Sequence, residues 1–517
     1  DAILSPSEAY KIMTPVFGKD IVYDAPPEKM AEQLKMLLPA LKDKRMRTYG
    51  EAVVLETEKN TAEWGEAGVI DFVDFCRVLT NFTSSRCLLG KEFREGMTEE
   101  FASVYHDLER GVAPIAYINA HLPIPSFRKR DKARVRMVEM ITQIIDARRR
   151  EKREGEDFLQ TLMESRYASG EALTENEITG MLLAGMFAGH HTSSVTTAWA
   201  MIELLQNPVW LRQTVAEIDR VFGGGQPVSH QALRELHLTE CVVKEALRLH
   251  PPLFMLVRVA QQDFVYKDYF IPKGTWVVIS PTVAHRMPEV FAAPNAFDPD
   301  RFAPPREEDK RDFAFIAFGG GRHKCLGNAF AILQIKAILA LLLGQYEFEL
   351  SGDPVDSDFQ GLVVGPKEPC RMRYRKRAHP SVTMSSAAAL QKLASESPAM
   401  TPEVAAAAAQ AGCPAHVSHG AQAAPAQAAG GCPVAHAAPL ATDESAPLQA
   451  GKRLRVVIDR DLCQGHAVCE GEAPEVFRLG ADGRVEAKLE FPPEALHARV
   501  RAAARFCPTH TIRLEEV

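Results

Sequence analysis

Apolar residues recur at helical spacing through most of the first 380 residues, and breaks rich in Pro and Gly separate these stretches. Clear examples of predicted helices are residues 177–205 and 240–249, and a further apolar helix begins near Asn328. Short runs such as residues 275–280, which lie between Pro and Gly signals, predict strands. The pattern therefore predicts a mainly α-helical domain with minor β-sheet over residues 1–380.

This pattern ends near residue 380. Residues 381–451 are rich in Ala, Pro, Ser, Gln and Gly and nearly lack aromatic side chains. Such a segment cannot bury enough apolar surface to offset the entropy lost on ordering, so we interpret it as a flexible linker. Patterned sequence returns at residues 454–458 and continues to Val517. Residues 452–517 therefore predict a second, small domain, of a size that benefits from a bound metal.

Composition and charge limit which binding partners and which cellular compartment the sequence favours. The net charge of −7 gives no reason to expect a nucleic acid or an anionic membrane as partner. No run of 18 apolar residues occurs, and the nearest candidate, residues 330–343, contains Gln334 and Lys336 and predicts a buried helix, not a transmembrane segment. The 10 cysteines show no disulfide framework, and three stand at ligand-like spacing near the C-terminal end. This favours a reducing compartment and metal binding.

A cysteine stands in a glycine-rich loop directly before the predicted helix at Asn328. The loop reads Phe-Gly-Gly-Gly-Arg-His-Lys-Cys-Leu-Gly over residues 318–327, which places Cys325 at a loop-to-helix junction. Amides and the helix dipole at such a junction favour a thiolate, and the glycines let a flat ligand approach the backbone. An anionic sulfur, with Arg322 and His323 as donors for carboxylates, is what haem iron and its propionates require. A structural turn around a buried cysteine is the alternative for this loop taken alone.

Two further motifs precede this loop. Glu245 and Arg248 lie one turn apart on a predicted helix, where they can form an ion pair, and Pro-Asp-Arg-Phe follows at residues 299–302. The order Glu-x-x-Arg, Pro-x-Arg-Phe and then the cysteine loop resembles the cytochrome P-450 superfamily. This resemblance implies a haem b group with Cys325 as its axial iron ligand, and a buried supporting network of Glu245, Arg248 and Arg301.

The segment Ala188-Gly189-His190-His191-Thr192 lies inside the predicted helix 177–205. A Gly followed by polar residues can loosen the helical hydrogen bonds and open a groove. In the superfamily this groove holds dioxygen, and by resemblance Thr192 helps to deliver protons. His191 stands where most members carry an acid, which is typical of sterol 14α-demethylases, and we interpret it as a proton relay because His titrates near neutral pH. A hydrogen-bonded core histidine without a catalytic role is the alternative.

Nearly all of residues 1–377 resemble the sterol 14α-demethylase family. The segment Tyr10–Asp24 is similar to the first substrate-recognition segment of that family. The resemblance assigns haem-propionate contacts to Tyr10, Lys35, Arg258 and His323. The family usually carries a lysine near position 34, where this chain has Leu34, so Lys35 is assigned in its place. It assigns the substrate pocket to eight residues: Ile12, Met13, Phe17, Tyr23, Phe187, Ala188, Leu253 and Met255. Apolar side chains of this kind are more often core, and only the resemblance assigns them to a pocket.

The activity implied is removal of the 14α-methyl group of a lanosterol-type sterol. Three successive oxidations convert methyl to alcohol and aldehyde and then release formate, and each consumes one O2 and two electrons. The alternative is the same chemistry on another sterol, a hopanoid-like lipid or another hydrophobic molecule. A redox sensor without turnover is a third hypothesis, which the Thr192 segment argues against. The N-terminal helices and strands common to the superfamily have no counterpart, so we expect upstream sequence to be missing.

The second domain carries Cys463-x-x-His466-x-x-Cys469 and a distant Cys507-Pro508. This resembles single-cluster bacterial ferredoxins, which are small α+β domains with a final Cys-Pro. Because His466 stands in place of the middle cysteine, three thiolates suit a 3Fe–4S cluster with His466 beside its open corner. The alternatives are a 4Fe–4S cluster that His466 ligates, and a zinc site. A ferredoxin fused in this way would supply the haem with electrons in cis.

The remaining partners follow from the motifs. No Gly-x-Gly-x-x-Gly follows a predicted strand, so we expect a separate NAD(P)H-dependent ferredoxin reductase. We expect a cytoplasmic location, with any membrane association arising through the sterol substrate. Two Cys-Pro motifs with a nearby His, at residues 413–416 and 432–436, could bind metal or free haem, but drift in a low-complexity linker is the favoured interpretation.

Overall fold

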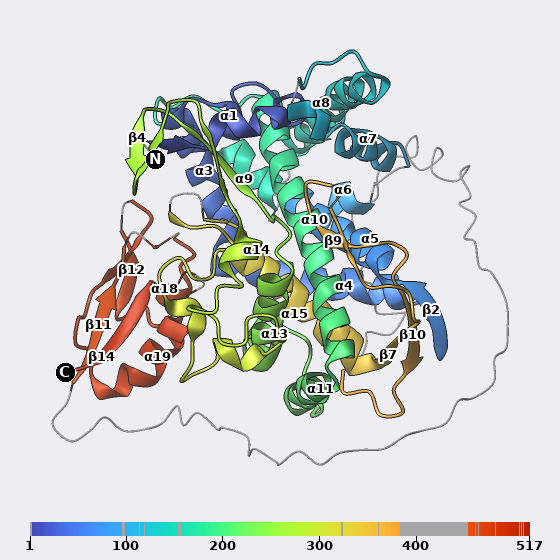
Figure 1. Cartoon of the computed structure of the whole chain (residues 1–517), viewed down its shortest axis with the longest axis vertical. Coiled ribbons are helices and arrows are strands. Elements are labelled where there is room, and N and C mark those ends of the chain that lie inside the picture. Colours follow the sequence, from blue (N-terminus) through green and yellow to red (C-terminus); the bar gives the residue numbers. More distant parts are fainter. Residues whose placement is uncertain are drawn as a thin grey trace.

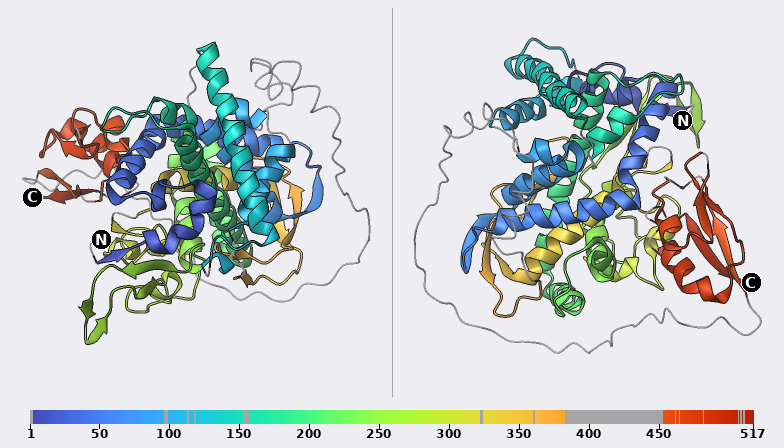
Figure 2. Two further views of the ribbon diagram at one scale, coloured as in Figure 1. Left: turned by 90° about the horizontal axis from the view of Figure 1, so that it is seen from above. Right: turned by 180° about the vertical axis from the view of Figure 1, so that it is seen from behind.

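The structure is a computed structural model of the chain. The residues it describes are 3–95, 99–112, 114–117, 119–152, 157–321, 324–359, 361–382, 453–460, 462–463, 465–480, 482–505, 507, 509 and 511–517. A mainly helical domain and a small α+β domain lie beside one another (Figures 1 and 2). The predicted linker beyond residue 382, with its two Cys-Pro motifs, lies outside the described residues, so its boundaries stay a prediction.

Helices make up most of the first domain. Its α-helices are α1 (Ser7–Tyr10), α2 (Thr14–Phe17), α3 (Pro27–Leu37), α4 (Asp43–Thr61), α5 (Phe72–Ser84), α6 (Lys91–Glu95), α7 (Glu99–Arg110), α8 (Pro125–Glu151), α9 (Phe158–Glu164), α10 (Glu175–Gln206), α11 (Pro208–Phe222), α12 (His230–Arg234), α13 (His237–Leu249), α14 (Pro281–Ala284) and α15 (Asn328–Gln345). Single turns of other helix types are η1 (Lys11–Met13), η2 (Val22–Asp24), η3 (Leu38–Leu41), η4 (Ser85–Leu89), η5 (Pro114–Tyr117), η6 (Pro299–Phe302) and η7 (Glu308–Lys310).

The longest helix, α10, crosses the centre of this domain (Figure 1). It begins at a capping box, in which the Glu177 amide donates to the Thr174 hydroxyl at 3.2 Å and the Thr174 amide donates to the Glu177 carboxylate at 2.9 Å. Buried residues occur on every side of α10, and α5, α13 and α15 pack against it. Side chains in the middle of α10 therefore lie in the interior of the domain.

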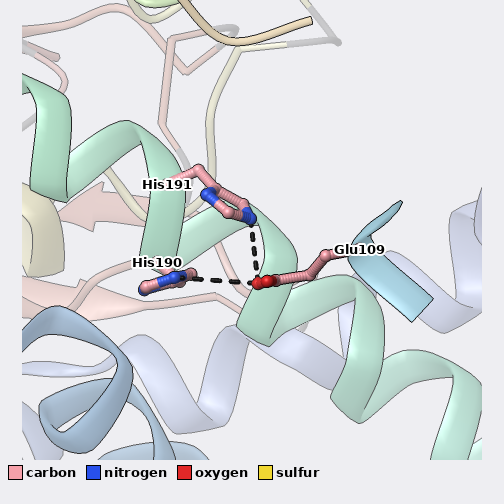
Figure 3. A group of neighbouring side chains, drawn as sticks. All are labelled: Glu109, His190 and His191. Carbon is pink, nitrogen blue, oxygen red and sulfur yellow. Dashed lines mark ion pairs between the residues drawn. The ribbon is translucent and has the colours of Figure 1, made fainter. Parts of the chain in front are cut away.

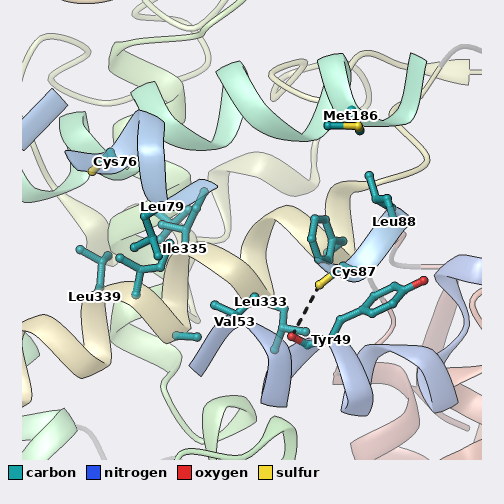
Figure 4. Packing of buried hydrophobic residues seen from close by; sticks show 14 of the residues in the cluster. Tyr49, Val53, Cys76, Leu79, Cys87, Leu88, Met186, Leu333, Ile335 and Leu339 are labelled. Atoms are coloured by element: carbon teal, nitrogen blue, oxygen red, sulfur yellow. Dashed lines mark hydrogen bonds between the residues drawn. The ribbon is translucent and has the colours of Figure 1, made fainter. Parts of the chain in front are cut away.

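Helix α15 forms much of the core. It is long and apolar enough to cross a membrane, but 83% of it is buried inside the domain. Leu333 and Leu339 of α15 belong to the same cluster as Val53 of α4 and Leu79 of α5 (Figure 4). The structure therefore shows α15 as a core helix, as the sequence predicts.

Among its described residues, the first domain has four small antiparallel sheets. Two are three-stranded, β1 (Leu4–Ser5) with β3 (Leu256–Ala260) and β6 (Trp276–Ile279), and β2 (Ala67–Asp71) with β10 (Arg371–Lys376) and β7 (Tyr346–Leu350). Two are hairpins, β4 (Phe264–Tyr266) with β5 (Tyr269–Ile271), and β8 (Ser357–Asp358) with β9 (Gly365–Pro366).

The second domain has its own core, which contains Val456, Phe477 and Val500. In it β11 pairs with β14 and β12 with β13, both antiparallel, and α18 packs against α19. Its elements are β11 (Leu454–Ile458), α18 (Val468–Glu472), β12 (Phe477–Leu479), β13 (Val485–Ala487), η9 (Glu494–Leu496), α19 (His497–Arg505) and β14 (Ile512–Glu516). The predicted fold class, mainly helical with minor sheet and a small α+β domain, is confirmed.

Candidate active site and cysteine cluster

Cys325 is held at the end of the glycine-rich loop, directly before α15. The Cys325 amide donates to the Phe318 carbonyl at 2.7 Å, and the Gly319 amide donates to the Ile316 carbonyl at 2.9 Å, so the loop folds back on itself. Gly319 has a φ of 71°, in the left-handed region that favours glycine. The Cys325 side chain is exposed to solvent. The sulfur is thus accessible on a backbone that its own hydrogen bonds fix.

The surroundings of Cys325 shift the pKa of its thiol in opposite directions. Although the side chain is accessible, the protein packed around it raises the pKa of the Cys325 thiol by desolvation. The Gly327 amide and the Lys324 ammonium lower this pKa. The amide acts as the sequence predicts, but desolvation outweighs it. A bound metal ion would therefore complete the stabilisation of a thiolate here.

Glu245, Arg248 and Arg301 form a network whose three side chains are fully buried. Arg248 donates to both carboxylate oxygens of Glu245, at 2.7 and 2.9 Å, and Arg301 Nε donates to Glu245 Oε1 at 3.0 Å. Glu308 accepts from Arg301 Nη1 at 2.8 Å, so two guanidinium groups face two carboxylates. The structure thus brings together the three residues predicted to support the cysteine loop, with their charges balanced.

His285, which sequence reasoning missed, connects this network to the cysteine loop. Arg248 Nη1 donates to the His285 carbonyl at 2.8 Å, and His285 Nε2 accepts from the Ile316 amide at 2.9 Å. Burial lowers the pKa of His285 to about 4, so the ring is neutral, with Nδ1 3.2 Å from the Arg248 carbonyl. Ile316 in turn accepts from Gly319, so the network reaches the loop through hydrogen bonds.

The predicted propionate contacts fall into three groups. Tyr10 of α1 and Arg258 of β3 lie together: burial raises the pKa of Tyr10, while the charge of Arg258 and a hydrogen bond from it lower that pKa. Lys35 is exposed on α3, and Leu34 beside it is half-buried. His323 lies outside the described residues, as does Arg322. Tyr10 and Arg258 can thus share one anionic partner, and the roles of Lys35 and His323 stay predictions.

A carboxylate and two histidines meet at the middle of α10 (Figure 3). His191 Nε2 lies 3.0 Å from Glu109 Oε1, and His190 Nε2 lies 3.7 Å from the same oxygen. Glu109 stands near the end of α7, far from α10 in the sequence, and sequence reasoning missed it. The only local signal is its place beside Tyr105 and Leu108 on the buried side of α7. The structure thus gives the predicted relay residue His191 an acidic partner.

The two histidines have different surroundings. His190 is 2% exposed, its Nδ1 lies 3.1 Å from the Thr80 hydroxyl, and burial lowers its pKa well below the ordinary value. His190 is therefore neutral, and we interpret it as a structural residue of the core. The His191 side chain is 30% exposed. Of the two, His191 is the one that can exchange protons with both Glu109 and the solvent-accessible side of α10.

Thr192 follows His191 and is half-buried. Its hydroxyl donates to the Ala188 carbonyl at 2.6 Å, and α10 continues through this segment without a break. The loosening of helical hydrogen bonds expected at Gly189 is thus small. It consists of the Thr192 hydroxyl competing with a helical amide for the Ala188 carbonyl. Ala188 itself is exposed, although residues on both sides of this segment are buried. The middle of α10 therefore combines an accessible backbone with a hydroxyl and a histidine.

Three of the predicted pocket residues belong to the apolar region around α2 and α10. The rings of Phe17 and Phe187 meet edge to face, 5.8 Å apart between centroids. Met13 packs against the same core cluster. The Tyr23 side chain lies outside what the structure describes.

The other predicted pocket residues lie elsewhere in the domain. Ile12 is 5% exposed and belongs to a separate small cluster with Ala116 and Phe127. Leu253 is half-buried and Met255 is exposed, and both precede β3. The segments that carry the predicted pocket residues therefore include both the interior of the domain and its surface.

Three cysteines of the second domain lie close together. Burial raises the pKa of Cys469 to about 12, and the thiols of Cys507 and Cys463 act in the same direction, which places all three within electrostatic reach. None of the three forms a disulfide. The Val485 amide donates to Cys463 Sγ at 3.2 Å. His466, 5% exposed, lies in the loop between Cys463 and Cys469. Three cysteines in one small core, of which Cys463 Sγ accepts from a backbone amide, suit a thiolate-bound metal cluster.

Both domains match known family models. Residues 6–372 match the cytochrome P-450 family, and residues 456–514 match a 4Fe–4S single cluster domain. The fold is also similar to that of the retinoic acid-bound cyanobacterial protein CYP120A1, with a TM-score of 0.65 and 23% identity over 71% of this chain and 83% of that one.

Proteins named as sterol demethylases align with almost three quarters of the chain. A sterol 14α-demethylase of Mycolicibacterium vanbaalenii is 43% identical over 384 residues, which are 73% of this chain and 84% of that protein. An obtusifoliol 14-α demethylase of Sorghum bicolor is 40% identical over 73% of this chain and 78% of its own length. A lanosterol 14-α demethylase of Bos taurus is 35% identical over 72% of this chain and 75% of its own length.

Proposed function

The chain belongs to the cytochrome P-450 family, and from this premise we propose that it removes the 14α-methyl group of a lanosterol-type sterol. It is a haem-thiolate monooxygenase joined to an iron–sulfur domain. The observation that carries the substrate proposal is the 43% identity to a sterol 14α-demethylase over 384 residues. Three successive oxidations would convert the methyl group to an alcohol and an aldehyde and then release formate.

The residues present fit a haem group. Cys325 offers an accessible sulfur with an amide and an ammonium that favour its anionic form, and Tyr10 with Arg258 offers donors for a propionate. When bound, haem supplies the reductive activation of O2. The chain itself holds the sulfur in place through the buried Glu245 network and its link through His285.

The middle of α10 would supply protons. Glu109 lies 3.0 Å from His191, which is followed by the Thr192 hydroxyl. We propose that Glu109 passes protons to His191 and that the Thr192 hydroxyl, one residue further along α10, passes them on by accepting a proton at its oxygen as it releases its own. Such a path suits His191 because its side chain is accessible, whereas the buried and neutral His190 would orient the pair.

Titration with lanosterol tests the substrate proposal directly. We expect the haem Soret band to shift on sterol binding, and turnover with lanosterol to release formate. A shift with other hydrophobic molecules, and none with lanosterol or its dihydro form, would favour the alternative in which the same chemistry acts on another lipid or small molecule.

The preference among sterols should depend on Ile12. An aliphatic side chain there leaves room for a second methyl group at sterol carbon 4, so we expect 4,4-dimethylated sterols to be preferred over 4-monomethylated ones. Because Ile12 packs with Ala116 and Phe127, the ring in Ile12→Phe must displace neighbours or enter the pocket. We expect the kcat/KM ratio between the two sterols to fall about ten-fold. Ile12→Leu, with conserved volume, is the control, and an unchanged ratio in Ile12→Phe would contradict the steric argument.

We further propose that the second domain holds a 3Fe–4S cluster on Cys463, Cys469 and Cys507. The support is that three thiols lie together with His466 in the loop between two of them. The domain model matched is described as 4Fe–4S, so the cluster type needs a direct measurement. We expect the electron paramagnetic resonance signal of a 3Fe–4S centre in the oxidised protein, and conversion to 4Fe–4S in His466→Cys. His497→Cys, in the same domain, should leave the signal unchanged, and a native 4Fe–4S centre would contradict this assignment.

The second domain would supply electrons to the haem of the same chain, after reduction by a separate NAD(P)H-dependent reductase. The composition of residues 381–451 predicts a flexible connection of about 70 residues, whose mean reach is on the order of 45 Å. Tethering of this kind gives effective concentrations up to about millimolar, so weak docking suffices.

Dilution distinguishes supply in cis from supply in trans. With saturating reductase, turnover per haem should stay constant when the whole protein is diluted. The same protein cut within the linker after purification should lose turnover steeply, because the cut makes the encounter bimolecular. Measured rates that fall equally in the whole and cut proteins would exclude supply in cis.

A further inference from the structure

The second domain contacts the first through the segment that carries its cysteines. His466 Nδ1 donates to the Leu41 carbonyl at the end of η3, at 3.2 Å. Arg234, the last residue of α12, forms an ion pair with Glu472, the last residue of α18. His466 stands three residues before Cys469 and Glu472 three residues after it. Both contacts thus flank one predicted cluster ligand, and they reach different elements of the first domain.

The residues of these contacts are largely removed from solvent. The Arg234 side chain is 9% exposed and that of Glu472 is 23% exposed, and His466 is 5% exposed. Charged pairs at such depth interact more strongly than exposed pairs, because less water screens them. The contact between the domains is therefore a specific interface and not a non-specific electrostatic encounter.

Lys324 carries a charge that acts on a cysteine of each domain. It directly precedes Cys325, and its ammonium is within electrostatic reach of Cys507 as well as Cys325. Burial lowers the pKa of Lys324, while both cysteines act to raise it. The same ammonium acts on His466, whose pKa burial lowers. A single positive charge thus lies within electrostatic reach of both cysteines.

We propose that the ferredoxin domain docks on the face that carries the Cys325 loop, through the Arg234–Glu472 ion pair and the His466–Leu41 hydrogen bond. His466, which stands in place of a ligand cysteine, is in this arrangement a docking contact. The partner of this surface is a named segment of the same chain, residues 453–517. The proposal rests on the electron supply in cis proposed above, which gives the docking its function.

A zero-length cross-link tests the ion pair in the whole holoprotein. In Arg234→Lys, a carbodiimide should form an amide between residue 234 and Glu472, detected by mass spectrometry in the monomer at low protein concentration. Arg371→Lys is the matched control, because Arg371 lies 2.8 Å from Asp353 within the first domain and should give the corresponding amide. The 234–472 amide should disappear in Arg234→Lys combined with Glu472→Gln. Formation of the 371–353 amide without the 234–472 amide would overturn the proposal.

Charge reversal tests the same surface without a cross-linking reagent. Arg234→Glu and Glu472→Arg each place like charges together, which should lower the docked fraction about ten-fold or more. Small-angle X-ray scattering should then give a larger radius of gyration, and the double reversal should restore the compact form. Glu490→Arg reverses a charge that pairs with Arg455 inside the ferredoxin domain and should leave the radius unchanged. An unchanged radius in both single reversals would overturn the proposal.

These readouts do not depend on turnover, so the two proposals can fail separately. If the 234–472 amide forms while whole and cut proteins lose turnover equally on dilution, the docking stands and the supply in cis fails. If turnover resists dilution while neither the amide nor the expansion is seen, the supply in cis stands and this docking surface is wrong.

Discussion

Cys325→His should lose completely the strongly red-shifted Soret band that the ferrous carbon monoxide complex of a haem-thiolate protein gives. The band requires a thiolate ligand, and imidazole in its place gives a band at shorter wavelength even where haem is retained. Cys325 is the accessible cysteine of the glycine-rich loop, with its amide fixed on the Phe318 carbonyl. Haem content by pyridine haemochrome, together with the carbon monoxide difference spectrum, measures retention and ligation separately.

A second cysteine provides the control for this experiment. Cys241 of α13 is also a free thiol, and burial raises its pKa to about 12. Cys241→Ser should keep the red-shifted band. A Cys325→His protein that kept the band would show that another residue holds the iron.

Glu109→Gln should lower turnover about a hundred-fold while leaving substrate affinity unchanged. Gln keeps the shape of the side chain near His191 but cannot exchange a proton, and loss of one acid–base group costs on the order of a hundred-fold or more. Electrons would still be consumed, so the ratio of product formed to NAD(P)H oxidised should fall with the turnover rate. Sterol binding, followed by the Soret shift, separates this effect from a damaged pocket.

The matched control lies on the same helix. Glu100→Gln removes a carboxylate of α7 that pairs at the surface with Arg136, and it should leave both turnover and coupling unchanged. Equal turnover in Glu109→Gln and the parent protein would mean that protons reach α10 by another path and that Glu109 only orients His191.

The parts of the site that the sequence predicted are those whose residues act through a fixed local spacing. Glu245 and Arg248 share a helical turn, and the glycines around Cys325 mark a backbone that only such residues adopt easily. α10 and α15 were equally predictable, because long apolar helices have few alternatives to a buried position.

The parts that could not be predicted depend on pairs distant in the chain. Glu109 is an acid near the end of an amphipathic helix, and apart from the buried Tyr105 and Leu108 beside it nothing in its neighbourhood distinguishes it from a surface residue until α7 meets α10. His285 connects Arg248 to Ile316 through hydrogen bonds that no motif encodes. Arg234 and Glu472 belong to different domains, so their pairing depends on how two folded surfaces fit together and not on local sequence.

The position of Cys469 between His466 and Glu472 has a kinetic consequence. The face of the ferredoxin domain that meets the haem domain is the one that carries this cysteine, so a reductase using that face cannot bind until the domain has left. Each electron then requires one departure and one return, and the slower of the two limits the flow of electrons. A moderate increase in docking affinity would speed the oxidation of the sterol. A larger increase would slow it, because release of the ferredoxin domain would become the slowest step. Turnover should therefore pass through a maximum as the affinity between the domains increases, and an interface of intermediate strength is the one that gives the highest turnover.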